Sequence, residues 1–131
     1  MSDIDGASHS WKDYFSHKEL ACQCGCGVYE MDSGFMREVG TLRTHLGFPM
    51  RVSSAKRCPA HNDRVSSTGY DGPHTTGRAI DILVNGYQAY DLVRQGMIRG
   101  MSVGVNQRGP RNARFIHLDL IERERPIMWT Y

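Results

Sequence analysis

The sequence predicts a single α+β domain in which helices flank a central antiparallel sheet. Two stretches, 32–46 and 86–99, place apolar residues at helical spacing. Several shorter apolar stretches are joined mostly by hairpin-length connections, which is typical of antiparallel strands. The 131 residues, 40% of them hydrophobic, suffice for one domain with its own core. No apolar run approaches the roughly 18 residues of a membrane-spanning helix, so such a helix is excluded.

The first expected helix covers residues 32–46. Its apolar residues recur every three or four positions and so share one helical face: Phe35, Met36, Val39, Leu42 and Leu46. Asp32 or Ser33 can cap its start, and Gly47 can end it.

The remaining elements alternate between strands and short helical segments. The expected strands cover 50–54, 78–84, 101–105, 114–120 and, near the last residue, 127–131. Pro59 suits the first turn of a brief helix over 60–65, and a turn-rich loop covers 69–72. The helix over 86–99 ends at Gly100 and carries Tyr90, Val93 and Met97 on one face, which is expected to pack into the core together with Met101.

Residues 1–13 are polar and are expected to be flexible, which leaves 14–131 as the folded domain. The start of the chain lacks the hydrophobic segment of a secretory signal, so synthesis in the cytoplasm without a signal peptide is expected. The formal net charge of +2 does not indicate nucleic acid as a partner.

The predicted strand over 78–84 carries an aspartate among apolar residues. Ala79, Asp81 and Leu83 share one face of this strand, because successive side chains alternate between faces. A carboxylate buried there without a partner is costly, so Asp81 needs a cation, and a metal ion is one candidate.

A later strand offers further metal ligands. Phe115, His117 and Asp119 share one face, opposite Ile116 and Leu118, so the polar side chains are expected to face a cleft. With His74, the set His, Asp and His is one that a catalytic zinc uses, leaving a fourth position for water. The alternative is that Asp81 pairs with Arg78 or another arginine while His117 is a hydrogen-bonded core residue.

His74, Gly77, Ala79 and Asp81 reproduce the pattern H-x-x-G-x-A-x-D. Together with His117, this pattern resembles the zinc-ligand motif of the D-Ala-D-Ala carboxypeptidase-like metallopeptidases, a family that shares its fold with the hedgehog signalling domain. Further segments are similar to short bacterial and phage members: 15–20 with the cysteine-rich turn after it, 52–62, 102–105 and 114–120. The resemblance covers about residues 14–131.

The resemblance implies a zinc hydrolase that cleaves peptide bonds of peptidoglycan, in the stem peptide or a cross-link, as an endopeptidase or a carboxypeptidase. It makes His74, Asp81 and His117 the ligands of Zn²⁺. It makes Arg57 the residue that binds substrate and stabilises the developing oxyanion. A monomer is expected that reaches the wall as a phage endolysin does, after lysis-linked release, or as a virion component.

One part of the family pattern is missing. Several relatives have an acid three residues before the last histidine ligand, and others have a histidine two residues before it. Here those positions hold Arg114 and Phe115. Asp119 is the closest substitute for the general base, or else it only orients His117. A module that binds zinc and peptidoglycan without cleaving it, or a virion structural module, is therefore the alternative.

Cys22, Cys24 and Cys26 lie in one glycine-rich run, and Cys58 stands apart. In a reducing compartment such a cluster indicates thiols or a soft-metal site more readily than disulfides. Structural zinc sites usually space a ligand pair by two to four residues, and C-x-C-x-C is tighter. Buried or capped thiols are the favoured interpretation, and a second, structural zinc involving Cys58 is the alternative.

Two further groups are candidates for substrate contacts. Five arginines lie in a stretch without acidic residues, and they form either a surface for an anionic polymer or ordinary solvated surface: Arg94, Arg99, Arg108, Arg111 and Arg114. Four aromatic residues are candidates for a substrate groove: Tyr87, Tyr90, Trp129 and Tyr131, although helical spacing favours a core position for Tyr90.

Overall fold

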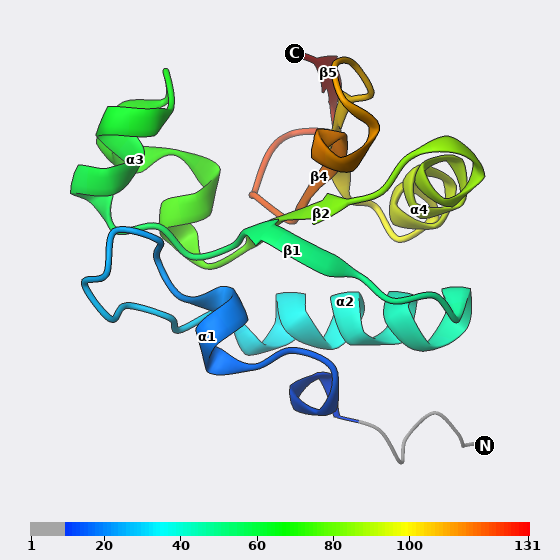
Figure 1. The fold of residues 1–131 in the computed structure, drawn as a ribbon, viewed down its shortest axis with the longest axis horizontal. Coiled ribbons are helices and arrows are strands. Elements are labelled where there is room, and N and C mark those ends of the chain that lie inside the picture. The colour runs from blue at the N-terminus through cyan, green and yellow to red at the C-terminus, as the bar shows by residue number, and fades with distance from the viewer. Residues whose placement is uncertain (1–9) are drawn as a thin grey trace.

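One five-stranded sheet forms the centre of the fold in the computed structural model, which describes residues 10–131. Its strands are β1 (Arg51–Ser54), β2 (Ala79–Leu83), β3 (Ser102–Asn106), β4 (Phe115–Asp119) and β5 (Met128–Thr130). The helices are α1 (His17–Leu20), α2 (Ser33–Leu46), α3 (Pro59–Val65) and α4 (Gly86–Ile98) (Figure 1). Every helix and strand expected from the sequence is present, and the α+β class is confirmed.

The sheet is mixed rather than purely antiparallel. Its order is β1-β2-β4-β3-β5, and the last pair, β3 with β5, runs parallel. The reason is that β4 already pairs with β2 on one edge and with β3 on the other. The chain reverses after β4 and pairs with the outer edge of β3. Because β3 is antiparallel to β4, the reversed strand β5 runs parallel to β3.

Helices α2 and α4 pack against each other and cover one face of the sheet, whereas α3 lies apart from them (Figure 1). The strand residues that face these helices are apolar and fully buried: Ile80, Ile82, Ile116 and Leu118. The opposite face of the same strands carries the polar residues Asp81, His117 and Asp119, as the alternation of side chains predicts.

Helix α2 follows the sequence closely. The Asp32 side chain accepts a hydrogen bond from the N–H of Phe35 at 2.8 Å and so caps the first turn. Gly47 ends the helix in the left-handed conformation, and the predicted apolar face is buried except for the partly buried Leu46.

The prediction for the buried face of α4 was wrong for Tyr90 and Met97. Tyr90 is 69% exposed and Met97 is 52% exposed, while the buried residues are Ala89, Leu92 and Gly96. A Cβ at Gly96 would lie 2.9 Å from a methyl carbon of Leu118. Small residues thus let the helix backbone approach β4, while Tyr90 and Met97 point outward. Of the three residues predicted for the core face, Val93 packs partly buried against the core. Met101 is buried, as expected.

Part of the segment expected to be flexible is ordered. Residues 1–9 lie outside the described part of the chain, but Trp11–Asp13 form a 3-10 turn that packs against α2. Ser10 and Asp13 form a capping box, and Ser16 and Glu19 form a second one at α1. This S-x-x-D/E pattern is the signal in the sequence that predicts both turns.

None of the described helices has the length and apolar character needed to cross a membrane.

The packing of Trp11 on α2 gives a prediction about Gly40. A Cβ at Gly40 would lie 2.8 Å from Cβ and 3.1 Å from Cα of Trp11. Gly40→Ala is expected to lower the free energy of unfolding by about 1–3 kcal/mol, whereas alanine in a helix normally stabilises by about 1 kcal/mol relative to glycine. Urea denaturation measures the difference, with the exposed Thr41→Ala as control. A Gly40→Ala protein more stable than wild type would show that the turn does not pack there.

Candidate metal centre

The pairing of β2 with β4 brings two of the predicted ligands side by side. Asp81 lies directly opposite His117 in the register, and Ala79 lies opposite Asp119. His74 comes from the 3-10 turn Pro73–Thr76, just before β2. Ligand atoms of His74, Asp81 and His117 lie within 4.8 Å of one another, and all three residues are buried. The structure therefore assembles the three residues that the sequence pattern selects.

Both imidazoles face the same carboxylate oxygen. The Nδ1 atom of His117 lies 2.9 Å from Oδ1 of Asp81, and Nε2 of His74 lies 3.3 Å from it. The two imidazole rings meet edge to face, with centroids 5.1 Å apart.

The second nitrogen of each ring is already engaged. Nδ1 of His74 lies 2.7 Å from the carbonyl oxygen of Ala55, which can only accept, so this nitrogen donates. Nε2 of His117 lies 2.7 Å from Oδ2 of Asp119 and donates to that carboxylate. Neutral rings would therefore turn two lone pairs toward the Asp81 carboxylate. Such an arrangement requires extra protons or a cation, and it fits a divalent metal ion.

The pKa shifts have the same cause. Burial opposes the charged form of His117, but hydrogen bonds to Asp119 and Asp81 raise its pKa above the ordinary value. Burial likewise opposes ionisation of Asp81, but hydrogen bonds from His117 and His74 hold its pKa well below the ordinary range. These contacts thus favour the protonated form of His117.

Asp119 lies behind His117 and is fully buried. Besides the bond to His117, its Oδ1 accepts a hydrogen bond from Nη1 of Arg123 at 2.7 Å and one from the N–H of Ile121 at 3.2 Å. Burial would raise the pKa of Asp119, but the bonds from His117 and Arg123 lower it. Arg123 was not predicted from the sequence, because only its spacing of four residues from Asp119 hints at the pair.

Arg57 lies beside the three residues. One of its terminal nitrogens, Nη2, is 3.9 Å from Oδ2 of Asp81. Its Nε donates to the Ser54 hydroxyl at 3.1 Å, and Nη1 donates to Oδ1 of Asn62 at 2.9 Å. Asn62 is fully buried and its amide donates to Thr68 and Gly69. Ser54 and Asn62 therefore fix the guanidinium, a role that the sequence pattern did not assign to them.

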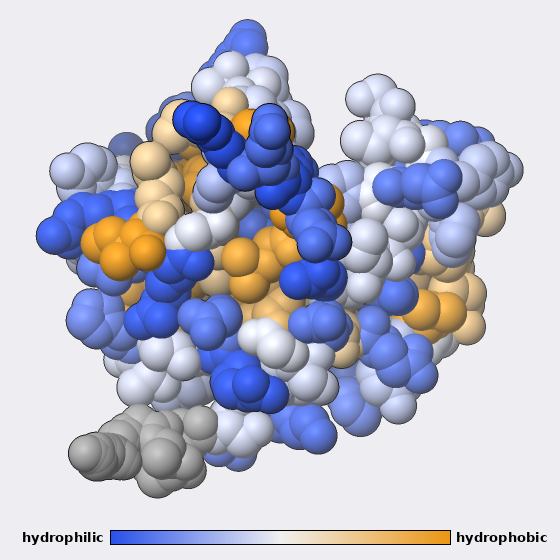
Figure 2. Space-filling model, turned by 180° about the vertical axis from the view of Figure 1, so that it is seen from behind, coloured by the Kyte–Doolittle hydropathy of each residue, from blue (hydrophilic) through white to orange (hydrophobic). Residues whose placement is uncertain are grey.

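The site opens into a cavity of about 590 Å³ between the segment after α3 and strand β5, where the outline of the molecule is notched (Figure 2). Arg57, His74, Asp81 and His117 contribute to its wall. A neighbouring hollow of about 550 Å³ shares Arg57, Asp81 and Phe115 with it. Among the described residues lining the first cavity, Asp81 is the one carboxylic acid.

Aromatic residues of β5 and the residue after it complete the wall. Trp129 and Tyr131, two of the four aromatic candidates for a substrate groove, line the cavity. The Trp129 ring lies 5.0 Å from the His117 ring. It lies against Gly104 of β3, the strand between β4 and β5, where a Cβ atom would clash with the ring. Tyr87 and Tyr90 instead lie on α4, which covers the other face of the sheet.

The arginine-rich stretch is divided between two elements. Arg94 lies on α4 and Arg99 directly follows it, and Arg99 pairs with Glu38 at 3.2 Å. The other three arginines lie in the connection from β3 to β4, where Nε of Arg114 donates to the carbonyl oxygen of Gly109.

Comparison with known proteins identifies a family. A family model described as Peptidase M15 matches residues 13–119, a range that contains His74, Asp81, His117, Arg57 and Asp119. No curated protein and no solved structure matches the chain.

The buried contacts of Asp119 give a prediction about stability. Asp119→Asn removes a charge that His117 and Arg123 both contact, and breaking such a buried pair costs about 3 kcal/mol. Urea denaturation at neutral pH measures this loss, and the exposed Glu124→Gln is the control, expected to change stability by less than about 0.5 kcal/mol. Equal stability of the Asn variant and wild type would contradict the buried contacts of Asp119 with His117 and Arg123.

Proposed function

Since the chain belongs to the peptidase M15 family, a family of metallopeptidases, we propose that it is a zinc-dependent enzyme that hydrolyses peptide bonds of bacterial peptidoglycan. The observation that carries this proposal is the buried trio His74, Asp81 and His117 on the wall of a cavity, beside Arg57.

His74, Asp81 and His117 are the proposed metal ligands. Two imidazoles and one carboxylate suit zinc, and three protein ligands leave a coordination position open. Zinc held there would lower the pKa of a bound water toward neutrality and polarise the carbonyl oxygen of the scissile bond.

Arg57 binds and orients the substrate in this proposal. Its Nε and one Nη1 hydrogen are used by Ser54 and Asn62, so the guanidinium cannot rotate freely. Its other N–H groups are available on the cavity wall, where they can donate to a peptide carboxylate or to a carbonyl oxygen that gains charge. A donor fixed before the reaction stabilises such charge without the cost of reorganisation.

Asp119 acts through His117 rather than on water. Its carboxylate is fully buried, both oxygens accept hydrogen bonds, and it is absent from the described cavity wall. Of the two roles that the sequence left open, we therefore assign it the orienting role. No side chain of the described wall is assigned as the proton acceptor for water.

We propose an endopeptidase rather than a carboxypeptidase. The two hollows meet at Arg57 and Asp81, so a peptide can extend to both sides of the scissile bond. Trp129 and Tyr131 supply apolar wall on one side. A cross-link between stem peptides has this two-sided form.

The resemblance to short phage and bacterial members of the family also suggests where the protein acts and in what form. The protein would act as a monomer on the wall, after lysis-linked release or as part of a virion, and it would use neither nucleic acid nor membrane as a partner. Efficient export of the protein from intact cells would contradict this setting.

A non-catalytic module that binds zinc and peptidoglycan is the second candidate. It is favoured by the cavity wall, where the one carboxylic acid among the described residues is Asp81, itself a proposed ligand. Substrate would then bind beside Arg57 without being cleaved.

Digestion of purified peptidoglycan separates the two candidates. The enzyme is expected to release new free amino groups, with cross-linked muropeptides converted to monomers in the mass spectrum. A chelator should abolish the release and added zinc should restore it. His117→Ala should reduce it to background, while the exposed His45→Ala should not. Binding without release by the wild type would support the second candidate, and loss of only a terminal residue would indicate a carboxypeptidase.

Arg57 variants test the proposed role in catalysis. Arg57→Gln removes a fixed charged donor, so kcat/KM is expected to fall about 10²–10³-fold, while one zinc still binds at the trio. Arg57→Lys should recover only part of the loss, because an ammonium cannot bond Ser54 and Asn62 in the same geometry. Arg64→Gln, at an exposed arginine, is the control. A kcat/KM of Arg57→Gln within about threefold of wild type would refute the role.

A further inference from the structure

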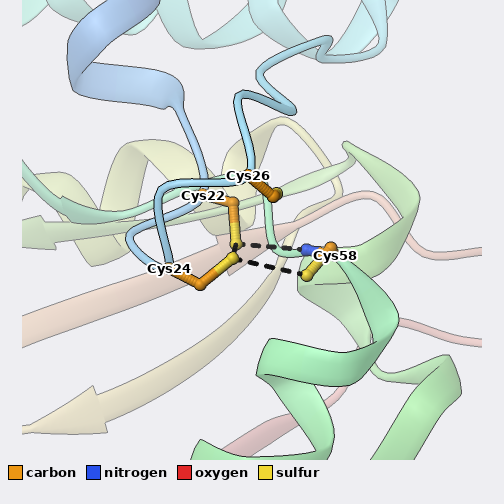
Figure 3. A group of neighbouring side chains, drawn as sticks. All are labelled: Cys22, Cys24, Cys26 and Cys58. Carbon is orange, nitrogen blue, oxygen red and sulfur yellow. Dashed lines mark hydrogen bonds between the residues drawn. The ribbon is translucent and has the colours of Figure 1, made fainter.

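Four cysteines from two distant segments meet on the side of the molecule near α3 (Figure 3). Cys22, Cys24 and Cys26 lie in the loop after α1, and Cys58 caps the start of α3. Their four sulfur atoms all lie within 4.8 Å of one another. The Cys22 and Cys24 sulfurs are 3.4 Å apart, and the Cys24 and Cys58 sulfurs are 3.7 Å apart.

These distances suit a shared metal ion better than disulfides. A disulfide holds its sulfurs at about 2.05 Å, and all four cysteines are free thiols here. In a zinc site with four zinc–sulfur bonds of about 2.3 Å, the sulfur atoms at the corners of the tetrahedron are about 3.8 Å apart. The two measured separations lie close to that value.

The conformation of the loop after α1 allows its three closely spaced cysteines to face one metal ion. Gly25 lies between Cys24 and Cys26, and Gly27 directly follows Cys26. Their φ values of +86° and +87° let the backbone turn sharply on both sides of Cys26. The N–H of Cys22 donates to the carbonyl oxygen of Val28 at 2.8 Å and closes the loop. The three side chains can therefore converge although single residues separate them.

Backbone N–H groups also point at the sulfurs. The N–H of Cys58 donates to the Cys22 sulfur at 3.3 Å, and the N–H of His61 donates to the Cys58 sulfur at 3.4 Å. Such bonds favour the negatively charged thiolate over the thiol. Cys24 and Cys26 are exposed, and exposed unliganded thiols are prone to oxidation, whereas bound thiolates are protected.

We propose that Cys22, Cys24, Cys26 and Cys58 bind one zinc ion, separate from the candidate site at His74, Asp81 and His117. Each thiol gives up its proton to solvent as its sulfur binds the ion. Four protein ligands fill the coordination shell, so the site is structural and not catalytic.

The proposed site would hold the segment that carries Arg57. Cys58 directly follows Arg57, and the ion would tie it to the loop after α1. The backbone already links the same regions, since the N–H of Lys56 donates to the carbonyl oxygen of Leu20 at 3.1 Å. Loss of the ion is therefore expected to disturb the position of Arg57 as well as the stability of the loop.

Metal counting on the full chain, purified without chelator, tests the proposal. Wild type is expected to hold two zinc ions per chain. The double variant Cys24→Ser/Cys58→Ser should hold one, retained at the histidine site, and His117→Ala should hold one, retained at the cysteines. Gln23→Ala, which changes the same loop but keeps every thiol, should hold two. A cysteine variant that keeps as much zinc as wild type would overturn the proposal.

Measurements on the wild type do not depend on how well a variant folds. Titration with an organomercurial should release one zinc ion as four thiols react. The cobalt-substituted protein should show the absorption of thiolate-to-cobalt charge transfer, and His117→Ala should keep it. No charge-transfer band, or fewer than four free thiols in the denatured, unreduced protein, would overturn the proposal. Because neither readout involves peptidoglycan, failure here is distinct from failure of the peptidase assignment.

Discussion

The antiparallel register of β2 with β4 is the constraint on which the candidate metal centre depends. It places Asp81 opposite His117 and, through the alternation of side chains, turns both away from the core. A slip of one residue would exchange the two faces, burying the acid and the imidazole against α2 and α4 while exposing isoleucines. The hydrophobic free energy of Ile80, Ile82, Ile116 and Leu118 thus fixes the register, and the register fixes the site.

The negative charges of Asp81 and Asp119 are each balanced by an arginine. The carboxylates of Asp81 and Asp119 face the guanidinium groups of Arg57 and Arg123, at 3.9 Å and 2.7 Å respectively. A divalent ion added to such a set would leave net positive charge at the cavity wall. That charge suits a substrate with a carboxylate or with a carbonyl oxygen that becomes negative.

The sequence predicted what depends on local periodicity. Period-two alternation identified the strand faces around Asp81 and His117, and capping residues identified the ends of α2. It did not predict the buried face of α4, because small residues such as Gly96 pack there through backbone proximity rather than hydrophobic size. The parallel position of β5 depends on which strand edge is free, and the contacts of Arg123 and Asn62 depend on tertiary structure. None of these leaves a periodic signal.

The segment joining β1 to α3 connects the two clusters of potential ligands. Ser54 and Asn62 fix Arg57, the Ala55 carbonyl fixes the His74 ring, and Cys58 contributes its thiol to the cysteine cluster. Residues 55–58 belong to neither a helix nor a strand. Side chains and neighbouring loops must therefore impose their conformation, and a metal ion at the cysteines would be a strong constraint on it. In the arrangement proposed above, a metal ion at the cysteine cluster would thus support the segment that carries Arg57, which lies outside the helices and strands.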